Sequence, residues 1–526
     1  MTAPPFSAST SDAMPAGINL GLARITRLLT LLHSPHLATP VVHIAGTNGK
    51  GSVSAYLSSI LSHSRLAVGR FNSPHLVDEW DCIQLHGRAV EPSLFREVKR
   101  EVEHVSQREG VEATSFEVLT ATAYALFARA KPPLDVAVVE VGMGGAEDAT
   151  NVVPADRTLF SVVTSVELDH QKFLGNTVAE IAQVKAGIAR EGGDVVLSLQ
   201  AHTEATEAVK AVAAARGATI WQAGEASPLP DTDDAPNAHG LPPPPLVSLP
   251  LAPTAVHPPT ASASLPKSGS PSITSHLPLP GSYQLSNAAT AVLAAHLLRS
   301  LPRPRALLPP GAPAQLSDAA VRAGVEATRW PGRLSWLSLP SPLPRSSSPS
   351  TSTAASPASP AKERLVLLDG AHNPSSAALL AAYLSSLTRT PQPVRPRALL
   401  FALSAPREPA EVVRPLLRAL SQPGERLRVV CVGFSPPEGM EWVRATEPEE
   451  LARGVREVVD ANAAQELSGE VEVLQAANIE AGLMRLEELE GAEGKEGSDP
   501  VVVAGSLYLV ADVLRLQRRL GRAADL

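Results

Sequence analysis

The segment from Val41 to Ser52, VVHIAGTNGKGS, constrains the fold more than any other part of the chain. Its apolar start is typical of a buried strand, and the VSAYLSSIL that follows has the periodicity of a helix. Between them, Gly46, Gly49 and Gly51 allow close backbone approach, and Lys50 adds a full positive charge. A strand, a glycine-rich turn and a helix N-terminus form a phosphate cradle, because backbone N–H groups and the helix dipole face the anion.

The match to the standard Walker pattern is imperfect, because a glycine separates Lys50 from Ser52 and Ile44 stands where the first glycine belongs. A glycine-rich turn alone is more often only a turn. With the flanking strand and helix, the segment predicts nucleotide binding by Gly49, Lys50, Gly51 and Ser52, the last within reach of a Mg²⁺ ion.

Composition narrows the functional classes. The net charge is −8 over 526 residues, and no stripe of Lys or Arg indicates nucleic-acid binding. No run of about 18 apolar residues predicts a membrane span. Cys82 and Cys431 are far apart, so no disulfide framework is implied, and the N-terminus lacks signal-peptide features. We expect a cytoplasmic protein, with a mitochondrial pool left open.

Two segments depart from globular composition. Ala226 to Pro280 holds 15 prolines, and Ser338 to Pro360 is nearly all Ser, Pro, Thr and Ala. Proline at that density removes backbone donors and leaves little apolar surface to offset the entropy of ordering. The sequence therefore predicts two disordered insertions, at about residues 226–280 and 338–362.

Strand-like and helix-like runs alternate elsewhere, which predicts a doubly wound α/β architecture with sites at the carboxyl ends of strands. The pattern is interrupted by Leu301-Pro302-Arg303-Pro304. We therefore expect one domain over residues 1–300 and a second over residues 301–526.

Polar residues gather where the expected strands end. Ser73 follows the strand Ala67–Phe71, Glu140 lies near the end of Val136–Val141, and His170 comes shortly after Thr158–Ser165. A glutamate in an apolar strand is costly to bury without compensation, and a metal ion near nucleotide phosphates would provide it. Ser73, Glu140 and His170 are thus candidate Mg²⁺ ligands. The plainer alternative is that Glu140 meets a lysine and His170 is a surface loop residue.

Lys185 lies in IAQVKAGIA, a segment that is small and apolar. A lysine in such a setting usually extends to solvent or pairs with a carboxylate. A depressed pKa would also make its amine nucleophilic enough to take up CO₂.

Several short motifs in order resemble one family. HIAGTNGKGS, NSPHL, EVGMGG with DATN, LDH, KAGI, YQLSNA, WPGR, LDGAHNP and AGSLYLVADV are similar to the motifs of the folylpolyglutamate synthase and dihydrofolate synthase family, a branch of the Mur ligases. The motifs run from Gly21 to Val513. The resemblance implies an N-terminal P-loop ATPase domain, a C-terminal Rossmann-like domain, and an ATP-dependent ligase that joins a pteroate or folate carboxyl group to L-glutamate.

The resemblance also assigns roles to residues. Asn287, Arg333 and Asp369 fall on ATP-contacting positions, and His372 falls on a motif histidine near the γ-phosphate. Lys185 falls on the lysine that is carbamylated in the family, where the carbamate serves a second Mg²⁺. With Lys50, His170 and His372 it forms the implied catalytic set. The positions implied for the pterin are Asn19, Leu20, Gly21, Phe116, Glu117, Val118, Leu119, Asp148 and Ala149.

Two activities compete within the family: addition of the first glutamate to dihydropteroate, and extension of a polyglutamate tail on folate. FNSPHLVDEWDCI is most like fungal dihydrofolate synthases, and it lacks the Arg-containing segment common in polyglutamylating members. Asp78, Glu79 and Asp81 would also repel a polyanionic tail, unless they are only solvated loop charges. We therefore expect dihydrofolate synthase, with folylpolyglutamate synthase or a bifunctional enzyme as the alternative.

Two positions depart from the family pattern. Ala146 stands where an arginine usually follows EVG-GG, and Leu403-Ser404-Ala405-Pro406 replaces an acidic turn. A non-catalytic nucleotide-binding relative is the alternative from a different class. The intact Lys50, Ser73, Glu140, His170, Lys185 and Asp369 argue against it.

Overall fold

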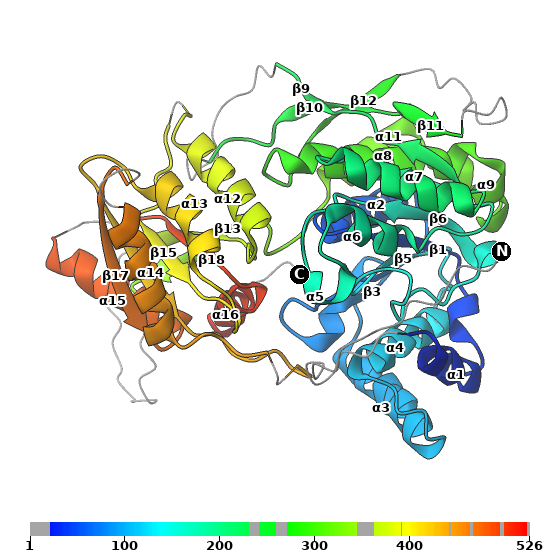
Figure 1. The fold of residues 1–526 in the computed structure, drawn as a ribbon, viewed down its shortest axis with the longest axis horizontal. Helices are drawn as coiled ribbons and strands as arrows, with labels where there is room; N and C mark the ends of the chain where they lie inside the picture. Colours follow the sequence, from blue (N-terminus) through cyan, green and yellow to red (C-terminus); the bar gives the residue numbers. More distant parts are fainter. Residues whose placement is uncertain are drawn as a thin grey trace, which may run out of the picture.

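The computed structural model describes residues 21–230, 241–258, 271–344, 362–390, 392–440, 443–462, 467–494 and 499–522. It has two α/β lobes side by side, with the N-terminal half in blue to green and the C-terminal half in yellow to red (Figure 1). The expected α/β class is confirmed. Asn19 and Leu20, two of the implied pterin positions, lie outside the described residues.

A nine-stranded sheet forms the centre of the N-terminal half, in the order β11-β8-β7-β6-β1-β5-β2-β3-β4. Strands β8 to β2 of this order are parallel, and β11, β3 and β4 are antiparallel additions at the edges. The strands are β1 (Val41–Ala45), β2 (Val68–Phe71), β3 (Ile83–Leu85), β4 (Arg88–Ala89), β5 (Val136–Glu140), β6 (Thr158–Val163), β7 (Asp194–Leu197), β8 (Thr219–Gln222) and β11 (Ala255–His257).

Helices cover both faces of this sheet. On one face α2, α8 and α11 pack over Val42, Ile44 and Val138; on the other α1, α3 and α4 pack over Val41 and Val139, and α6 and α7 lie beyond them. Their bounds are α1 (Ala23–Leu31), α2 (Lys50–His63), α3 (Pro92–Arg108), α4 (Ser115–Arg129), α5 (Gln171–Leu174), α6 (Val178–Ala186), α7 (Thr203–Ala215), α8 (Tyr283–Ser300), α9 (Pro302–Leu307), α10 (Ala312–Gln315) and α11 (Asp318–Glu326). Alternate residues of a strand point to opposite faces, so the short apolar strands are buried on both sides.

The first proline-rich segment is not disordered where the structure describes it. Strands β9 (Ser227–Pro228), β10 (Leu246–Pro250) and β12 (Ser272–His276) form a three-stranded antiparallel sheet. Val247, Leu249 and Ile273 are buried in the same core as β1 and α8. The prediction of a disordered insertion was wrong here, because alternate apolar residues supply a buried face despite the prolines. Residues 231–240 and 259–270 lie outside the description.

The second insertion begins and ends in strands. Ser338 belongs to β13 (Ser335–Ser341) and Lys362 opens β14 (Lys362–Leu368), and these two strands pair antiparallel. Those ends of the expected disordered segment are therefore ordered, and residues 345–361 lie outside the described part of the chain.

The helices that follow residue 301 pack on the N-terminal half. Leu308, Leu316 and Val325 share the core of α2 and α8, and α11 lies against α2. The C-terminal sheet begins only at Ser335. We therefore propose a division near residue 330 in place of the expected one at residue 300.

The C-terminal half contains a six-stranded sheet in the order β13-β14-β18-β15-β16-β17, which is parallel except for β13. Its remaining elements are β15 (Ala398–Phe401), β16 (Arg426–Val432), β17 (Glu470–Ala476), β18 (Val501–Ala504), α12 (Pro374–Leu387), α13 (Ala410–Leu420), α14 (Pro448–Asn462), α15 (Ile479–Ala492) and α16 (Leu507–Arg519). None of the helices in the described ranges combines the length and apolar character needed to cross a membrane.

The ordered part of the first insertion yields a stability prediction. Leu249→Ala should lower the free energy of unfolding by about 2–5 kcal/mol, because Leu249 is fully buried and its truncation leaves a cavity. The matched control is Thr274→Ala, an exposed position on β12, which should change it by less than about 0.5 kcal/mol. Equal denaturant midpoints for the two variants would show that this sheet does not belong to the core.

Candidate functional site

The glycine-rich turn after β1 leaves no room for side chains. Gly49 has φ +91°, and a Cβ there would lie 2.4 Å from Asn287 Oδ1. A Cβ on Gly51 would lie 2.4 Å from the Trp330 ring. Helix α2 begins at Lys50, so its free N–H groups face the turn. This geometry provides the expected anion cradle, with Asn287 beside it.

Glu140 lies at the end of β5 and is buried. Asn72 Nδ2 donates to its Oε2 over 2.7 Å, and Lys50 Nζ is 3.9 Å from its Oε1. Burial raises the pKa of the Glu140 carboxyl, and Lys50 and Asn72 act in the opposite direction. The plainer expectation that Glu140 meets a lysine is thus confirmed, and that lysine belongs to the cradle.

Ser73 offers an observation that bears on a metal. Its Oγ is buried, and no described residue hydrogen-bonds to it. Buried hydroxyls normally have a partner, so this oxygen fits a missing ligand. Within the described ranges, no three His, Cys, Asp or Glu side chains could together hold a metal ion. A cation beside Ser73 and Glu140 would therefore need further oxygens from outside this pair, such as water or a bound phosphate.

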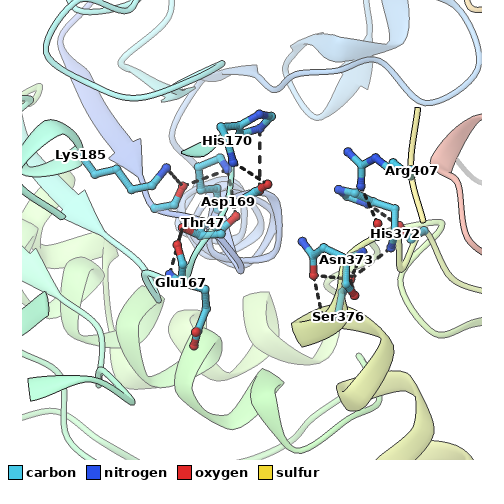
Figure 2. Close-up of polar contacts among 12 residues, drawn as sticks. Thr47, Glu167, Asp169, His170, Lys185, His372, Asn373, Ser376 and Arg407 are labelled. Atoms are coloured by element: carbon cyan, nitrogen blue, oxygen red, sulfur yellow. Dashed lines mark hydrogen bonds and ion pairs between the residues drawn. The ribbon is translucent and has the colours of Figure 1, made fainter. Parts of the chain in front are cut away.

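Lys185 is almost completely buried in α6, and its Nζ donates to the Gly46 carbonyl over 2.8 Å. Burial, together with the Lys50 charge, lowers the pKa of the Lys185 amine to about 7. A substantial neutral fraction therefore exists at neutral pH. Figure 2 shows Lys185 beside Asp169 and His170, and all three line one small pocket with Lys50.

The C-terminal half contributes through the loops before β13 and after β14. The Asp369 carboxylate accepts from the Leu334 N–H (2.9 Å) and the Ala371 N–H (2.8 Å), which ties the Arg333 loop to its own loop. His372 Nδ1 is 2.8 Å from the Gly370 carbonyl, and burial together with the Arg407 charge lowers the pKa of His372 to about 4. The imidazole is therefore neutral, with Nδ1 as donor and Nε2 as a free lone pair.

One cavity between the halves brings together most of the residues predicted for nucleotide binding, metal binding and catalysis. It is lined by Gly49, Lys50, Gly51, Ser52, Ser73, Glu140, His170, Arg333 and His372. In Figure 2 the His170 and His372 clusters come from different halves. Asn48 Nδ2 donates to Ser375 Oγ over 3.0 Å across the same interface. Asp369 lies behind this lining and acts through the loops that it holds.

Some of the implied pterin positions lie around the turn that follows β5, and others lie in the hydrophobic core. Phe116 packs against Gly142, and the Gly21 N–H contacts the Glu147 carbonyl, so both lie near the turn that follows β5. Asp148 is buried, and its carboxylate accepts from the Met143 and Thr150 N–H groups. Val118, Leu119 and Ala149 belong to the core, and Glu117 pairs with Arg24. The structure thus gives Asp148 a role in holding the turn, and its contact with substrate stays a prediction.

The acidic loop does not carry the free charge that the sequence suggested. Asp81 accepts backbone N–H groups from Leu76, Val77 and Asp78 at 2.6–2.9 Å. Glu79 pairs with Lys99, and Asp78 pairs with Arg518 of α16. Because each carboxylate is already engaged, repulsion of a polyanionic tail no longer supports the choice between the two activities.

Two cationic residues of the site were not predicted. Arg407 donates to the His372 carbonyl, and Arg70 of β2 lines the central cavity. Arg70 was detectable, since a charged residue inside the apolar strand VGRF carries the same burial cost that identified Glu140. Arg407 follows a turn that departs from the family pattern, and its sequence context contains no signal.

Comparisons with known proteins agree with this geometry. Residues 44–295 match the model of the Mur ligase middle domain, and residues 356–516 match that of the dihydrofolate synthetase C-terminal domain. The chain is 30% identical over 500 residues to the dihydrofolate synthetase of Saccharomyces cerevisiae, covering 95% of this chain and 98% of that one. It is also 30% identical over 499 residues to the probable dihydrofolate synthetase of Schizosaccharomyces pombe, with the same coverage.

A solved structure gives the same result for the fold. The folylpolyglutamate synthase of Mycobacterium tuberculosis, complexed with ADP and AMPPCP, superimposes with a TM-score of 0.67 at 26% identity. The match covers 96% of both chains, so it includes both halves and the interface between them.

The cradle yields a direct prediction. Lys50→Ala should lower nucleotide-dependent turnover by at least about 10²-fold, because it removes a preorganised charge from the phosphates. Steady-state phosphate release is the measurement, and Lys210→Ala, at a surface lysine of α7, is the control. Near-normal turnover of Lys50→Ala would show that the cradle is misassigned.

Proposed function

Because this chain belongs to the dihydrofolate synthetase family of Mur-type ligases, we propose that it is a dihydrofolate synthase. It joins L-glutamate to 7,8-dihydropteroate and converts ATP to ADP and phosphate. The observation that carries the proposal is the cavity in which the cradle of one half faces Arg333 and His372 of the other. Such a site suits a ligase that must hold a nucleotide and two further substrates.

The first step is phosphoryl transfer. A carboxylate does not condense with an amine at neutral pH, so a carboxylate oxygen of dihydropteroate attacks the γ-phosphorus and ADP leaves. The resulting acyl phosphate carries the activated carbonyl. This chemistry needs positioning and charge neutralisation more than covalent help, and Lys50 and Arg333 provide both from opposite sides.

The second step is attack of the glutamate amine on the acyl carbonyl. The C–N bond forms, the amine loses a proton, and the C–O bond to phosphate breaks. The neutral His372 has a free Nε2 lone pair that can accept a hydrogen bond from the attacking amine, because its Nδ1 is engaged by Gly370. The proton that the amine loses leaves with the released phosphate, which is the stronger base. Enclosure between the halves excludes water, which would otherwise hydrolyse the acyl phosphate.

The residues fit bound Mg²⁺, and we expect two sites. Ser73 and Glu140 would hold one ion beside the phosphates, as the unpartnered Ser73 hydroxyl supports. His170 and a carbamylated Lys185 would hold the other, since they line one pocket. The bound ions would neutralise phosphate charge as it shifts to the leaving group.

Carbamylation of Lys185 follows from its environment. The ammonium group first loses one proton. The neutral amine then attacks CO₂, an N–C bond forms as one C=O π bond opens, and a second proton is released, so a cation becomes an anion. The low pKa provides the neutral amine, and the Lys50 charge nearby favours the anionic product.

The buried free cysteines Cys82 and Cys431 support a cytoplasmic location.

Folylpolyglutamate synthase activity is the second candidate. Because the acidic loop is neutralised by Lys99, Arg518 and backbone donors, charge in that loop does not disfavour a polyglutamate tail. A bifunctional enzyme would satisfy the same geometry. The choice of dihydropteroate therefore depends on the match of nearly full length to dihydrofolate synthetases.

The proposal predicts the product. Purified protein with ATP, Mg²⁺, L-glutamate and dihydropteroate should form dihydrofolate, detected by mass spectrometry, whereas tetrahydrofolate should gain no further glutamate. Addition of glutamate to tetrahydrofolate but not to dihydropteroate would show that the protein is a folylpolyglutamate synthase and not a dihydrofolate synthase. Loss of ATP turnover with either acceptor would indicate a non-catalytic relative.

Lys185 gives a second prediction. Lys185→Ala should be nearly inactive at normal stability, and high concentrations of formate or acetate should restore part of the activity by supplying the missing carboxylate. Lys185→Arg should not be restored, because guanidinium keeps its charge and does not take up CO₂. Activity that survives in Lys185→Arg would refute the carbamate.

A third prediction concerns pH. Protein depleted of CO₂ should regain activity when CO₂ is supplied at one fixed dissolved concentration, with bicarbonate adjusted at each pH. Recovery should then be faster as pH rises through about 7, where the Lys185 amine becomes neutral. The rise should level off at higher pH. Recovery that is independent of pH, measured as initial rates after a timed incubation, would contradict the titration of this amine.

A further inference from the structure

Within the described part of the chain, Arg70 is a buried cation with no hydrogen-bond acceptor and no ion-pair partner. It lies in β2, and only 9% of its surface is exposed. Among the residues that the structure describes, none accepts a hydrogen bond from its buried Nε, and none forms an ion pair with it. A buried charge normally has an anionic partner, because desolvation is otherwise uncompensated.

The two carboxylates that attract Arg70 most strongly are Glu140 and Asp81. Glu140 points to the same face of the sheet as Arg70 but is engaged by Asn72 and Lys50. Asp81 is engaged by three backbone N–H groups. Both anions are therefore used elsewhere, and the guanidinium keeps its hydrogen-bonding capacity.

The Arg70 side chain belongs to the lining of the central cavity. Its guanidinium carbon lies 5.0 Å from the centre of the Trp330 ring, and Trp330 in turn contacts Gly51 of the cradle. Gln84, the register partner of Arg70 on β3, lines the same cavity. The cation–π contact places the guanidinium beside the cavity, where its N–H groups can donate to a ligand.

We propose that Arg70 is a binding residue for an anionic oxygen of a reacting ligand, either a phosphate of the nucleotide or the carboxylate of the pteroate. This inference rests on the proposed function, since both anions enter this cavity during the reaction. It adds a third cation to Lys50 and Arg333. It also explains why an arginine is kept in an otherwise apolar strand.

The test compares Arg70, which is proposed to bind a ligand, with Arg303, whose contacts lie within the protein. Arg70→Met keeps the stem against Trp330 and removes the charge, and Arg70→Lys keeps the charge without the planar fork. The control is Arg303→Met, because the Arg303 guanidinium donates to the Ala155 and Thr158 carbonyls within the protein. For each full-length variant, calorimetry measures the affinities for Mg·ADP and for dihydropteroate, and thermal melting without ligand measures stability.

Arg70→Met should lose about 10- to 100-fold in affinity for one of the two ligands, as expected for charge-assisted hydrogen bonds, at an unchanged or higher melting temperature. Arg70→Lys should recover part of that loss. Arg303→Met should melt earlier and bind normally. The affected ligand identifies whether phosphate or carboxylate is bound.

Two results would overturn the proposal: unchanged affinity for both ligands in Arg70→Met, or a lower melting temperature with equal losses for both ligands. The nucleotide measurement is independent of the proposed activity. Wild-type protein that binds Mg·ADP but not dihydropteroate would contradict the proposed activity and leave the nucleotide test of Arg70 valid.

Discussion

The cations gathered at the interface between the halves are the constraint on which the site depends. Lys50, Arg70 and Arg333 line the central cavity together with Glu140, Asp81 and Asp169, and Lys185 lies in the adjoining pocket. Like charges at low dielectric repel strongly, and each loses hydration. Bound anions such as the proposed polyphosphate, carboxylate and carbamate would offset this repulsion.

The same constraint explains why the two halves must meet. The cradle alone has Lys50, and the opposing loops bring Arg333 and His372 to the cavity. Asn48 bonds to Ser375 across the interface, and Arg515 and Arg518 of α16 bond to the Val77 carbonyl and to Asp78. These contacts position the cations of one half over the cradle of the other, and in the proposed reaction such an enclosed site would keep water from the carbonyl.

Local constraints in the sequence were enough to predict the cradle, the α/β class and the burial of Glu140. A glycine turn between a strand and a helix admits few geometries, and a carboxylate in an apolar strand requires compensation. The proline-rich segment was misjudged because composition outweighed the alternation of Val247 and Leu249, which marks a buried strand face. The partner of Asp78 could not be predicted, since Arg518 lies 440 residues away in the sequence.

The most direct test traces an oxygen atom from the dihydropteroate carboxylate into the released phosphate. Dihydropteroate labelled with ¹⁸O in its carboxylate is incubated with the protein, ATP, Mg²⁺ and L-glutamate. One ¹⁸O should be transferred to each phosphate released, because the bridging oxygen of the acyl phosphate comes from the carboxylate and stays on phosphorus when the C–O bond breaks. Mass spectrometry of the phosphate measures the transfer. Unlabelled phosphate formed at the rate of ATP consumption would show that water attacks the nucleotide, and would contradict ligation through a carboxyl phosphate in this cavity.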